Sequence, residues 1–141
     1  MADGLEGGCL CGAVRYTVAV DPLAVVACHC RNCQRQSGSA LSLVVVVPRD
    51  ALQVQGTLKT FEDRGTSGQP VYRRFCPKCG SPVLTDTPAA KAQGLIFIKG
   101  GTADEAQQLQ PSTHYWTERA HGWIAFPDEC TVLLREEAPT S

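Results

Sequence analysis

The stretch Cys76-Pro77-Lys78-Cys79-Gly80 places two thiols three residues apart in a tight turn that ends in glycine. This is the form of a zinc knuckle, because Gly80 can adopt a positive φ and let backbone N–H groups turn toward metal-bound sulfurs. Near the N-terminus, Cys9-Leu10-Cys11-Gly12 carries a similar pattern. Four thiolates complete a tetrahedral zinc shell. We therefore expect a closed, structural zinc site that joins the N-terminal strand to a distant hairpin, with the ligands Cys9, Cys11, Cys76 and Cys79.

A second motif, Cys28-His29-Cys30-Arg31-Asn32-Cys33, places three thiols within six residues at the end of an apolar segment. In an extended chain Cys28 and Cys30 point to one side and His29 to the other, and a turn returns Cys33 toward them. Three ligands with a vacant position are typical of a catalytic zinc. Two alternatives stay open: His29 could close the site as a fourth ligand, or Cys30 and Cys33 could form a redox C-x-x-C pair.

Composition limits the class of protein. The chain has 141 residues, which suggests one domain over 1–141 with frayed ends at about 1–6 and 135–141. It has 13 Lys and Arg against 14 Asp and Glu and no basic block, which argues against binding to nucleic acid or to acidic membranes. The beginning lacks a secretory pattern, and the longest apolar run, Leu43 to Val47, is too short to span a bilayer. We therefore expect a cytoplasmic protein whose 8 cysteines serve metals rather than disulfides.

Alternation and β-branched residues predict a mainly β, mainly antiparallel domain with little helix. The expected strands are 13–20, 23–28, 40–47, 54–61, 71–75 and 95–99, with a hairpin tip at 65–68. Helix is expected for a turn or two after Cys30, and a capping box from Thr102 to Glu105 favours a second helix at 103–109 only weakly over a loop.

Several other residues could take part in the site. Cys130 stands alone and is expected to be a buried packing residue. His29 or His114 could supply a proton, while His121 has no better claim. Trp116 and Trp123 could line a pocket, although packing is the more common role. The cations close to ligand cysteines could either balance thiolate charge or bind a substrate carboxylate; they are Arg31, Arg35, Arg73, Arg74 and Lys78.

Three blocks, in order, resemble the family of glutathione-dependent formaldehyde-activating enzymes and centromere protein V. They are Gly7 to Tyr16, Cys28 to Gly38 and Phe75 to Ser81, with weaker similarity at 99–102, 111–114 and 122–123. The resemblance implies an Mss4-like β-tent, a structural zinc on Cys9, Cys11, Cys76 and Cys79, and a catalytic zinc on Cys28, Cys30 and Cys33.

The resemblance also implies a carbon–sulfur lyase activity that joins glutathione, as co-substrate, and formaldehyde to S-hydroxymethylglutathione. A zinc-bound thiol loses its proton near neutral pH and can attack the carbonyl carbon of a small aldehyde. Two other functions remain open. One is a non-enzymatic, zinc-stabilised binding module of the same fold. The other is a redox enzyme like methionine sulfoxide reductase, which would need Cys130 or a metal-free Cys30 as its reactive thiol.

Overall fold

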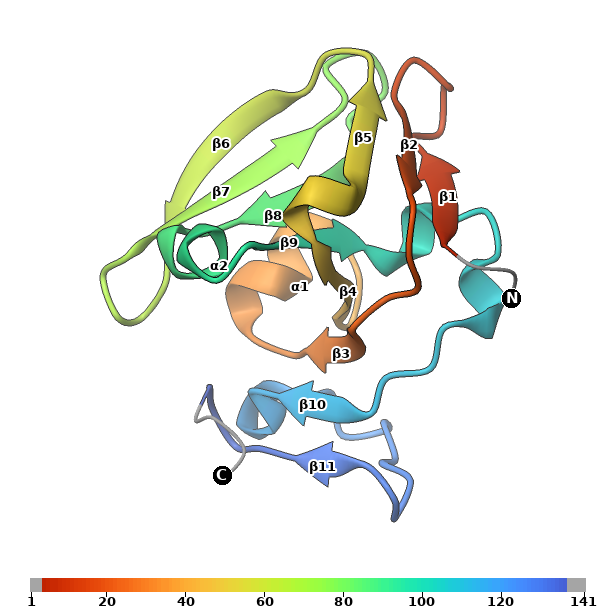
Figure 1. The fold of residues 1–141 in the computed structure, drawn as a ribbon. Helices are drawn as coiled ribbons and strands as arrows, with labels where there is room; N and C mark the ends of the chain where they lie inside the picture. The colour runs from red at the N-terminus through yellow and green to blue at the C-terminus, as the bar shows by residue number, and fades with distance from the viewer. Residues whose placement is uncertain (1–3, 137–141) are drawn as a thin grey trace.

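Two β-sheets form the framework of the computed structural model, which describes residues 4–136 (Figure 1). The smaller sheet has the order β1 (Leu5–Gly8), β2 (Arg15–Val18) and β5 (Leu52–Gln55). The larger sheet has the order β11 (Thr131–Val132), β10 (Thr113–Tyr115), β3 (Ala24–Cys28), β4 (Ser42–Pro48), β9 (Leu95–Lys99), β8 (Pro82–Asp86), β7 (Pro70–Phe75) and β6 (Lys59–Arg64).

Helices are short and lie between the strands. The α-helices are α1 (Arg31–Ser37) and α2 (Pro88–Ala92), and the 3₁₀ turns are η1 (Arg49–Ala51), η2 (Gly100–Thr102), η3 (Ala106–Gln108) and η4 (Thr117–Arg119). From β3 to β6 the neighbouring strands are antiparallel, whereas β10 runs parallel to both β3 and β11. The mainly β fold class expected from the sequence is confirmed, with a parallel edge added to an antiparallel sheet.

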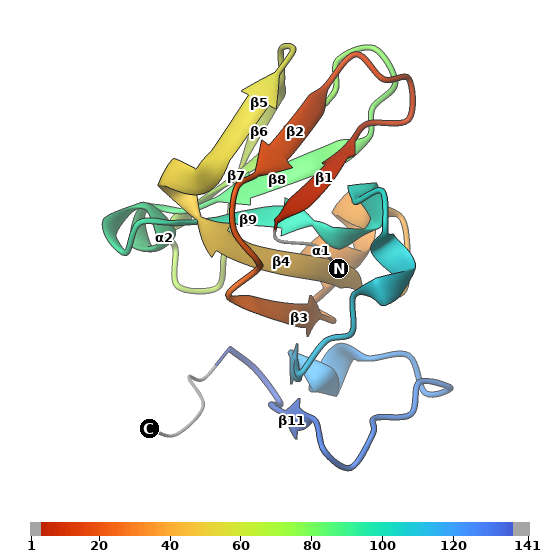
Figure 2. The same cartoon turned by 45° about the vertical axis from the view of Figure 1, so that its right-hand side comes forward.

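One face of the larger sheet forms the apolar core. Residues directly opposite on neighbouring antiparallel strands project to the same face, so Val45 of β4, Ile98 of β9 and Leu84 of β8 share one face. All three are buried and pack in one cluster with Tyr16 and Val18 of the smaller sheet. In Figure 2 the smaller sheet lies in front of β7 and β8, and its core residues pack with those of β4, β8 and β9. This face holds the two layers together.

The opposite face of the same sheet is polar. Cys28 of β3 lies opposite Ser42 of β4, and Lys99 of β9 lies opposite Val44, two residues further along β4. Phe97, two residues before Lys99, lies opposite Thr85, which in turn lies opposite Arg73 of β7. The pairings therefore bring a thiol, a hydroxyl, an ammonium and a guanidinium to one face, next to α1.

Three local expectations differ from the structure. The segment 54–61 is not one strand, because Gly56 has φ 100° and separates β5 from β6, which belong to different sheets. The segment 103–109 forms no α-helix; the Thr102 hydroxyl donates to the Lys99 carbonyl at 2.7 Å instead of capping a helix. Leu5 and Glu6, expected to fray, pair with β2 in β1. The remainder of the expected fraying, at 1–3 and 137–141, falls outside the described residues.

The expected hairpin tip at 65–68 is confirmed, since it joins the antiparallel strands β6 and β7. Strands β8 and β10 and the helix α2 were not expected. The helix begins at Pro88 because the Thr87 hydroxyl accepts a hydrogen bond from the Ala90 N–H at 3.0 Å. Among the residues that the structure describes, no helix has the length and apolar character needed to cross a membrane.

Candidate metal centres

Four cysteines from distant parts of the chain meet where the two sheets come together. Cys9 and Cys11 follow β1, and Cys76 and Cys79 lie in the turn between β7 and β8. The four Sγ atoms lie within 4.8 Å of one another, and the Sγ atom of Cys11 is 3.7 Å from that of Cys9 and 3.8 Å from that of Cys76. Tetrahedral zinc with bonds of about 2.3 Å separates its sulfur ligands by about 3.8 Å. The donor set and its spacing therefore fit a zinc ion.

Backbone N–H groups in this four-cysteine cluster point at sulfur. The Val14 N–H donates to Cys9 Sγ at 3.3 Å, and the Lys78 N–H donates to Cys76 Sγ at 3.4 Å. The two turns use glycine in the left-handed region, with φ 81° at Gly12 and 79° at Gly80. Such hydrogen bonds stabilise thiolates, the form in which cysteine binds metal.

Three further cysteines meet where β3 runs into α1. Cys28 is the last residue of β3, Cys30 is the N-cap of α1, and Cys33 lies in its first turn. Their Sγ atoms lie within 4.8 Å of one another, and Cys30 Sγ accepts the Cys33 N–H at 3.3 Å. Hydrogen bonds with Cys28 and Cys30, together with the charges of Lys99 and Arg73, hold the pKa of the Cys33 thiol well below its usual range. This three-cysteine cluster also suits a thiophilic metal ion.

His29 lies between Cys28 and Cys30 in sequence, but its side chain points elsewhere. The ring is fully buried, and Nε2 lies 3.0 Å from Nδ1 of His114, with Phe126 against both rings. The group of possible ligand atoms at this centre contains the three sulfurs and no imidazole nitrogen from the described residues. The His29 side chain thus points away from the three sulfurs, as the alternation of side chains in an extended chain predicts.

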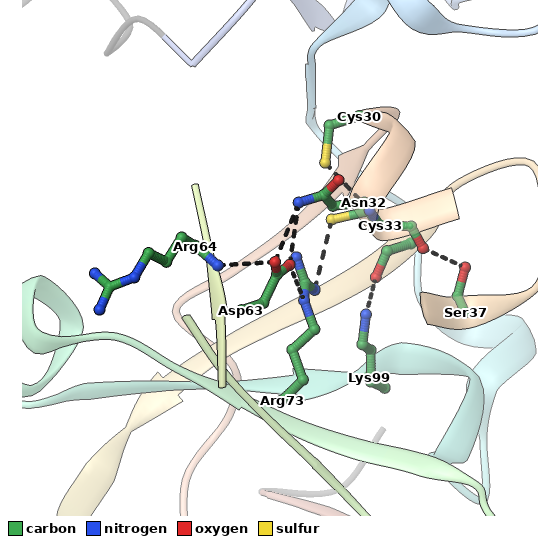
Figure 3. Close-up of polar contacts among 9 residues, drawn as sticks. Cys30, Asn32, Cys33, Ser37, Asp63, Arg64, Arg73 and Lys99 are labelled. Atoms are coloured by element: carbon green, nitrogen blue, oxygen red, sulfur yellow. Dashed lines mark hydrogen bonds and ion pairs between the residues drawn. The ribbon is translucent and has the colours of Figure 1, made fainter. Parts of the chain in front are cut away.

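Two buried cations stand beside the three-cysteine cluster. Arg73 donates from Nε to Asp63 at 2.9 Å, and its Nη1 lies 4.0 Å from Cys33 Sγ. Lys99 donates from Nζ to Ser42 Oγ at 2.7 Å. Figure 3 shows Arg73 reaching toward Cys33 and Asp63 while Lys99 stands beside it. Asp63 also accepts a hydrogen bond from the Asn32 amide at 3.1 Å, which links α1 to β6.

Comparison with known proteins places this arrangement in a family. The family model of the glutathione-dependent formaldehyde-activating enzyme matches residues 4–119, which include both cysteine clusters. The chain belongs to this family. Its fold also resembles the crystal structure of a Rhodobacter sphaeroides protein solved in a structural genomics programme, with a TM-score of 0.55 and 18% identity over 76% of this chain and 92% of that one. This likeness shows the fold alone.

Most of the cations singled out in the sequence of this family member lie away from sulfur. Arg74 pairs with Asp86, which also binds Arg49, and Arg31 donates to the Gln34 side chain. The side chains of Arg35 and Lys78 are exposed. Of the five, Arg73 is the one whose side chain contacts a cysteine sulfur in the described residues.

The remaining candidates lie outside both clusters. Cys130 is half-buried rather than buried, and its Sγ donates to the Pro111 carbonyl at 3.4 Å. Trp123 is 76% exposed, so it is not a packing residue. Trp116 is half-buried with φ 60° and has the Arg135 guanidinium 5.7 Å from its ring centroid. His121 lies 3.1 Å from the Gln34 carboxamide oxygen.

Sequence reasoning missed two residues of the site, Lys99 and Asp63. Both residues reach the site through strand pairing. Lys99 shares the polar face of the sheet with Cys28, and Asp63 lies on β6, the strand that pairs with the strand of Arg73. For Lys99, the signal that could have found it is a charged residue inside an expected strand, whereas Asp63 lies outside the expected strands and carries no such signal. Lys99 ends the expected strand 95–99 and is buried in the structure.

Proposed function

We propose that this protein joins glutathione and formaldehyde to S-hydroxymethylglutathione, the carbon–sulfur lyase reaction in its synthetic direction. Membership of the family supports the two substrates. The observation that carries the proposal is the difference between the clusters, with four sulfurs in one and three in the other. Four thiolates fill a tetrahedral shell, whereas three leave one position for a substrate.

In this proposal each chain holds two zinc ions. Cys9, Cys11, Cys76 and Cys79 hold the structural one, and Cys28, Cys30 and Cys33 hold the catalytic, more labile one. A metal ion at the three-cysteine cluster supplies a Lewis acid that favours the deprotonated form of a bound thiol near neutral pH. We also propose that the protein acts in the cytoplasm, where its thiols stay reduced.

The chain's own residues prepare this site for an anionic sulfur. Arg73 brings a positive charge 4.0 Å from Cys33 Sγ, and Asp63 and Asn32 fix the position of the guanidinium. Because the side chain of Arg73 is only 6% exposed, water screens its charge weakly. A second thiolate beside the three cysteines would therefore meet a compensating cation.

The reaction needs no further reagent. The sulfur of the thiol forms a bond to the carbonyl carbon, and the π electron pair of the C=O bond moves to oxygen. The thiol loses one proton and the product oxygen gains one, so atoms and charge balance. Holding the two reactants together is the main contribution that a preformed site makes to such an addition.

The test is glutathione titration of protein loaded with cobalt in place of zinc. The wild-type protein should change its visible absorption as the thiol sulfur binds cobalt, and NMR exchange should show faster formation of S-hydroxymethylglutathione than without protein. Cys30→Ser should abolish both effects, while Cys130→Ser, which removes a cysteine outside the clusters, should leave them intact. Saturating glutathione with no spectral change in the wild-type protein would contradict the proposal.

A further inference from the structure

A pocket of about 470 Å³ lies at the end of α1, the helix that carries Cys33. Its wall comes from the end of α1, the start of β4, the turn before β8 and the end of β9. It includes several hydroxyl groups and a single charged side chain, that of Lys99. The lining residues that matter here are Ser37, Ser42, Ser81, Lys99 and Thr102.

Lys99 is a buried ammonium group with spare hydrogen-bonding capacity. Lys99 is 6% exposed, and the one hydrogen bond that its Nζ atom donates to a described residue is the bond to Ser42 Oγ. An ammonium group has three N–H donors, so two remain available. None of the ion pairs formed by the described residues includes Lys99. Buried charges are normally paired, which makes the bare ammonium an unusual feature of this wall.

Ser42 adds a third donor at the same place. Its oxygen accepts the hydrogen bond from Lys99, so its own hydrogen is free to donate. Ser42 is 1% exposed and is held by the β3–β4 pairing, which fixes its position. The pair of side chains therefore offers an O–H and two N–H groups, the donor set that suits a carboxylate.

The two buried cations make different hydrogen-bond contacts. Arg73 is the one with a contact to cysteine sulfur, while Lys99 makes its bond to a pocket hydroxyl. Burial lowers the pKa of Lys99, and an anion beside the ammonium would stabilise its charged form. Both charges act on the Cys33 thiol, but Lys99 is the one that also lines the pocket, where its remaining N–H groups can bind a ligand.

The pocket is close enough to serve the same substrate as the three-cysteine cluster. Ser42 lies directly opposite Cys28 across the β3–β4 ladder, so their side chains project to the same face. On the other side, the Ser37 hydroxyl, also in the pocket wall, donates to the Cys33 carbonyl at 2.7 Å.

We propose that Lys99 and Ser42 form a carboxylate-binding subsite for the thiol substrate, whose sulfur lies at the three-cysteine cluster. The inference rests on the proposed function for the position of the sulfur. Glutathione carries two carboxylates, either of which has the required chemistry, so the subsite would select acidic thiols over neutral ones.

The test compares glutathione with its diethyl ester, in which both carboxylates are blocked, by calorimetric titration of the zinc-loaded protein. The wild type should bind glutathione about tenfold more tightly than the diester, as expected for a charge-assisted hydrogen bond. Lys99→Met should remove this preference by weakening glutathione binding and leaving diester binding unchanged. Lys91→Met, at an exposed lysine on α2, is the control and should keep the preference. The two monoethyl esters then tell which carboxylate binds.

Thermal unfolding of each variant shows whether it is folded. If Lys99→Met is not folded, Ser42→Ala is tested in its place. It should reduce the preference for glutathione over the diester about threefold, the effect expected from the loss of one hydrogen bond. A folded variant that weakens the binding of both ligands equally, or of neither, overturns the proposed subsite. Should the wild type fail to bind glutathione at all, the proposed function falls. The subsite is then decided by 3-mercaptopropionate and its methyl ester, where a Lys99-dependent difference supports it and equal binding overturns it.

Discussion

Nε2 of His29 lies 3.0 Å from Nδ1 of His114, a residue 85 positions further along the chain. The bond needs a hydrogen on one nitrogen and a lone pair on the other, so the two rings cannot both be protonated. His29 follows β3 directly and lies between Cys28 and Cys30 in sequence. The bond therefore joins this end of β3 to β10. It helps to hold the short segment between β3 and α1, which has Cys28 on one side and Cys30 on the other.

The pH dependence of stability tests this contact. Burial lowers the pKa of His114 below its unfolded value of about 6.5. The neutral ring's contribution is fully present above that pH and is lost as the pH falls through the lower folded pKa, at up to about 1.4 kcal/mol per pH unit. His114→Phe should cost about 1–3 kcal/mol at pH 8 and show a smaller loss between pH 7 and pH 5. Urea unfolding at each pH measures both.

His121→Phe is the matched control, because it also introduces phenylalanine but does so at an exposed histidine. It loses one hydrogen bond, to the Gln34 side chain, and should lower the stability by no more than about 1 kcal/mol. An identical pH slope in His114→Phe and the wild type would contradict the prediction.

Two neighbouring arginines allow a test of the charge beside the three-cysteine cluster. Arg73 contacts Cys33 Sγ, whereas Arg74 projects to the other face of β7 and pairs with Asp86. Arg73→Gln should weaken metal binding at this cluster about tenfold, the usual cost of losing a partner of a metal ligand. Arg74→Gln should leave the affinity unchanged. Competition with a chelator of known affinity measures both, and equal losses would refute a specific role for Arg73.

The four-cysteine cluster is expected to be structural. Cys11→Ser should remove one metal ion per chain and lower the free energy of unfolding by more than about 3 kcal/mol, because binding at a structural site contributes directly to folding. Cys130→Ser, with a half-buried cysteine outside both clusters, should keep the full metal content. Elemental analysis and urea unfolding give the two numbers. Unchanged metal content in Cys11→Ser would show that the cluster holds no ion.

Gly7 provides a test of how the smaller sheet is packed. A Cβ atom at Gly7 would lie 2.3 Å from the Tyr16 hydroxyl and 2.4 Å from the Thr102 carbonyl, which is backbone and cannot easily move. Gly7→Ala should therefore destabilise the fold by about 2–4 kcal/mol. At Gly122 no atom of the described residues, apart from its chain neighbours, lies within 4 Å of the same position, so Gly122→Ala should have little effect. A Gly7→Ala variant as stable as the wild type would argue against this packing.

The cysteine clusters were accessible from sequence because each depends mainly on short spacing. Cys28, Cys30 and Cys33 meet through one strand end and one helical turn, which local geometry dictates. The pairing of Cys11 with Cys76 came from matching glycine signatures, since the two residues are 65 positions apart. The structure brings both sets together as expected; whether zinc fills them, and what each set does, stays a prediction.

The strand boundaries and the position of Lys99 depend on tertiary strand pairing, which no local pattern encodes. Gly56 separates two strands that read as one run of alternating residues, and the short strand β10 is defined by its neighbour β3. Lys99 becomes part of the site only because β9 pairs with β4 in one register; a shift of one residue would turn its side chain to the apolar face.

The four-cysteine cluster is a cross-link in which a metal ion would replace a covalent bond. Cys11 and Cys76 enclose a loop of 65 residues, and a permanent bridge of that span removes about 4 kcal/mol of chain entropy from the unfolded state. A bridge through zinc can open and close again, so its benefit follows the concentration of free metal. The lifetime of this protein would thus follow the zinc supply of its cell.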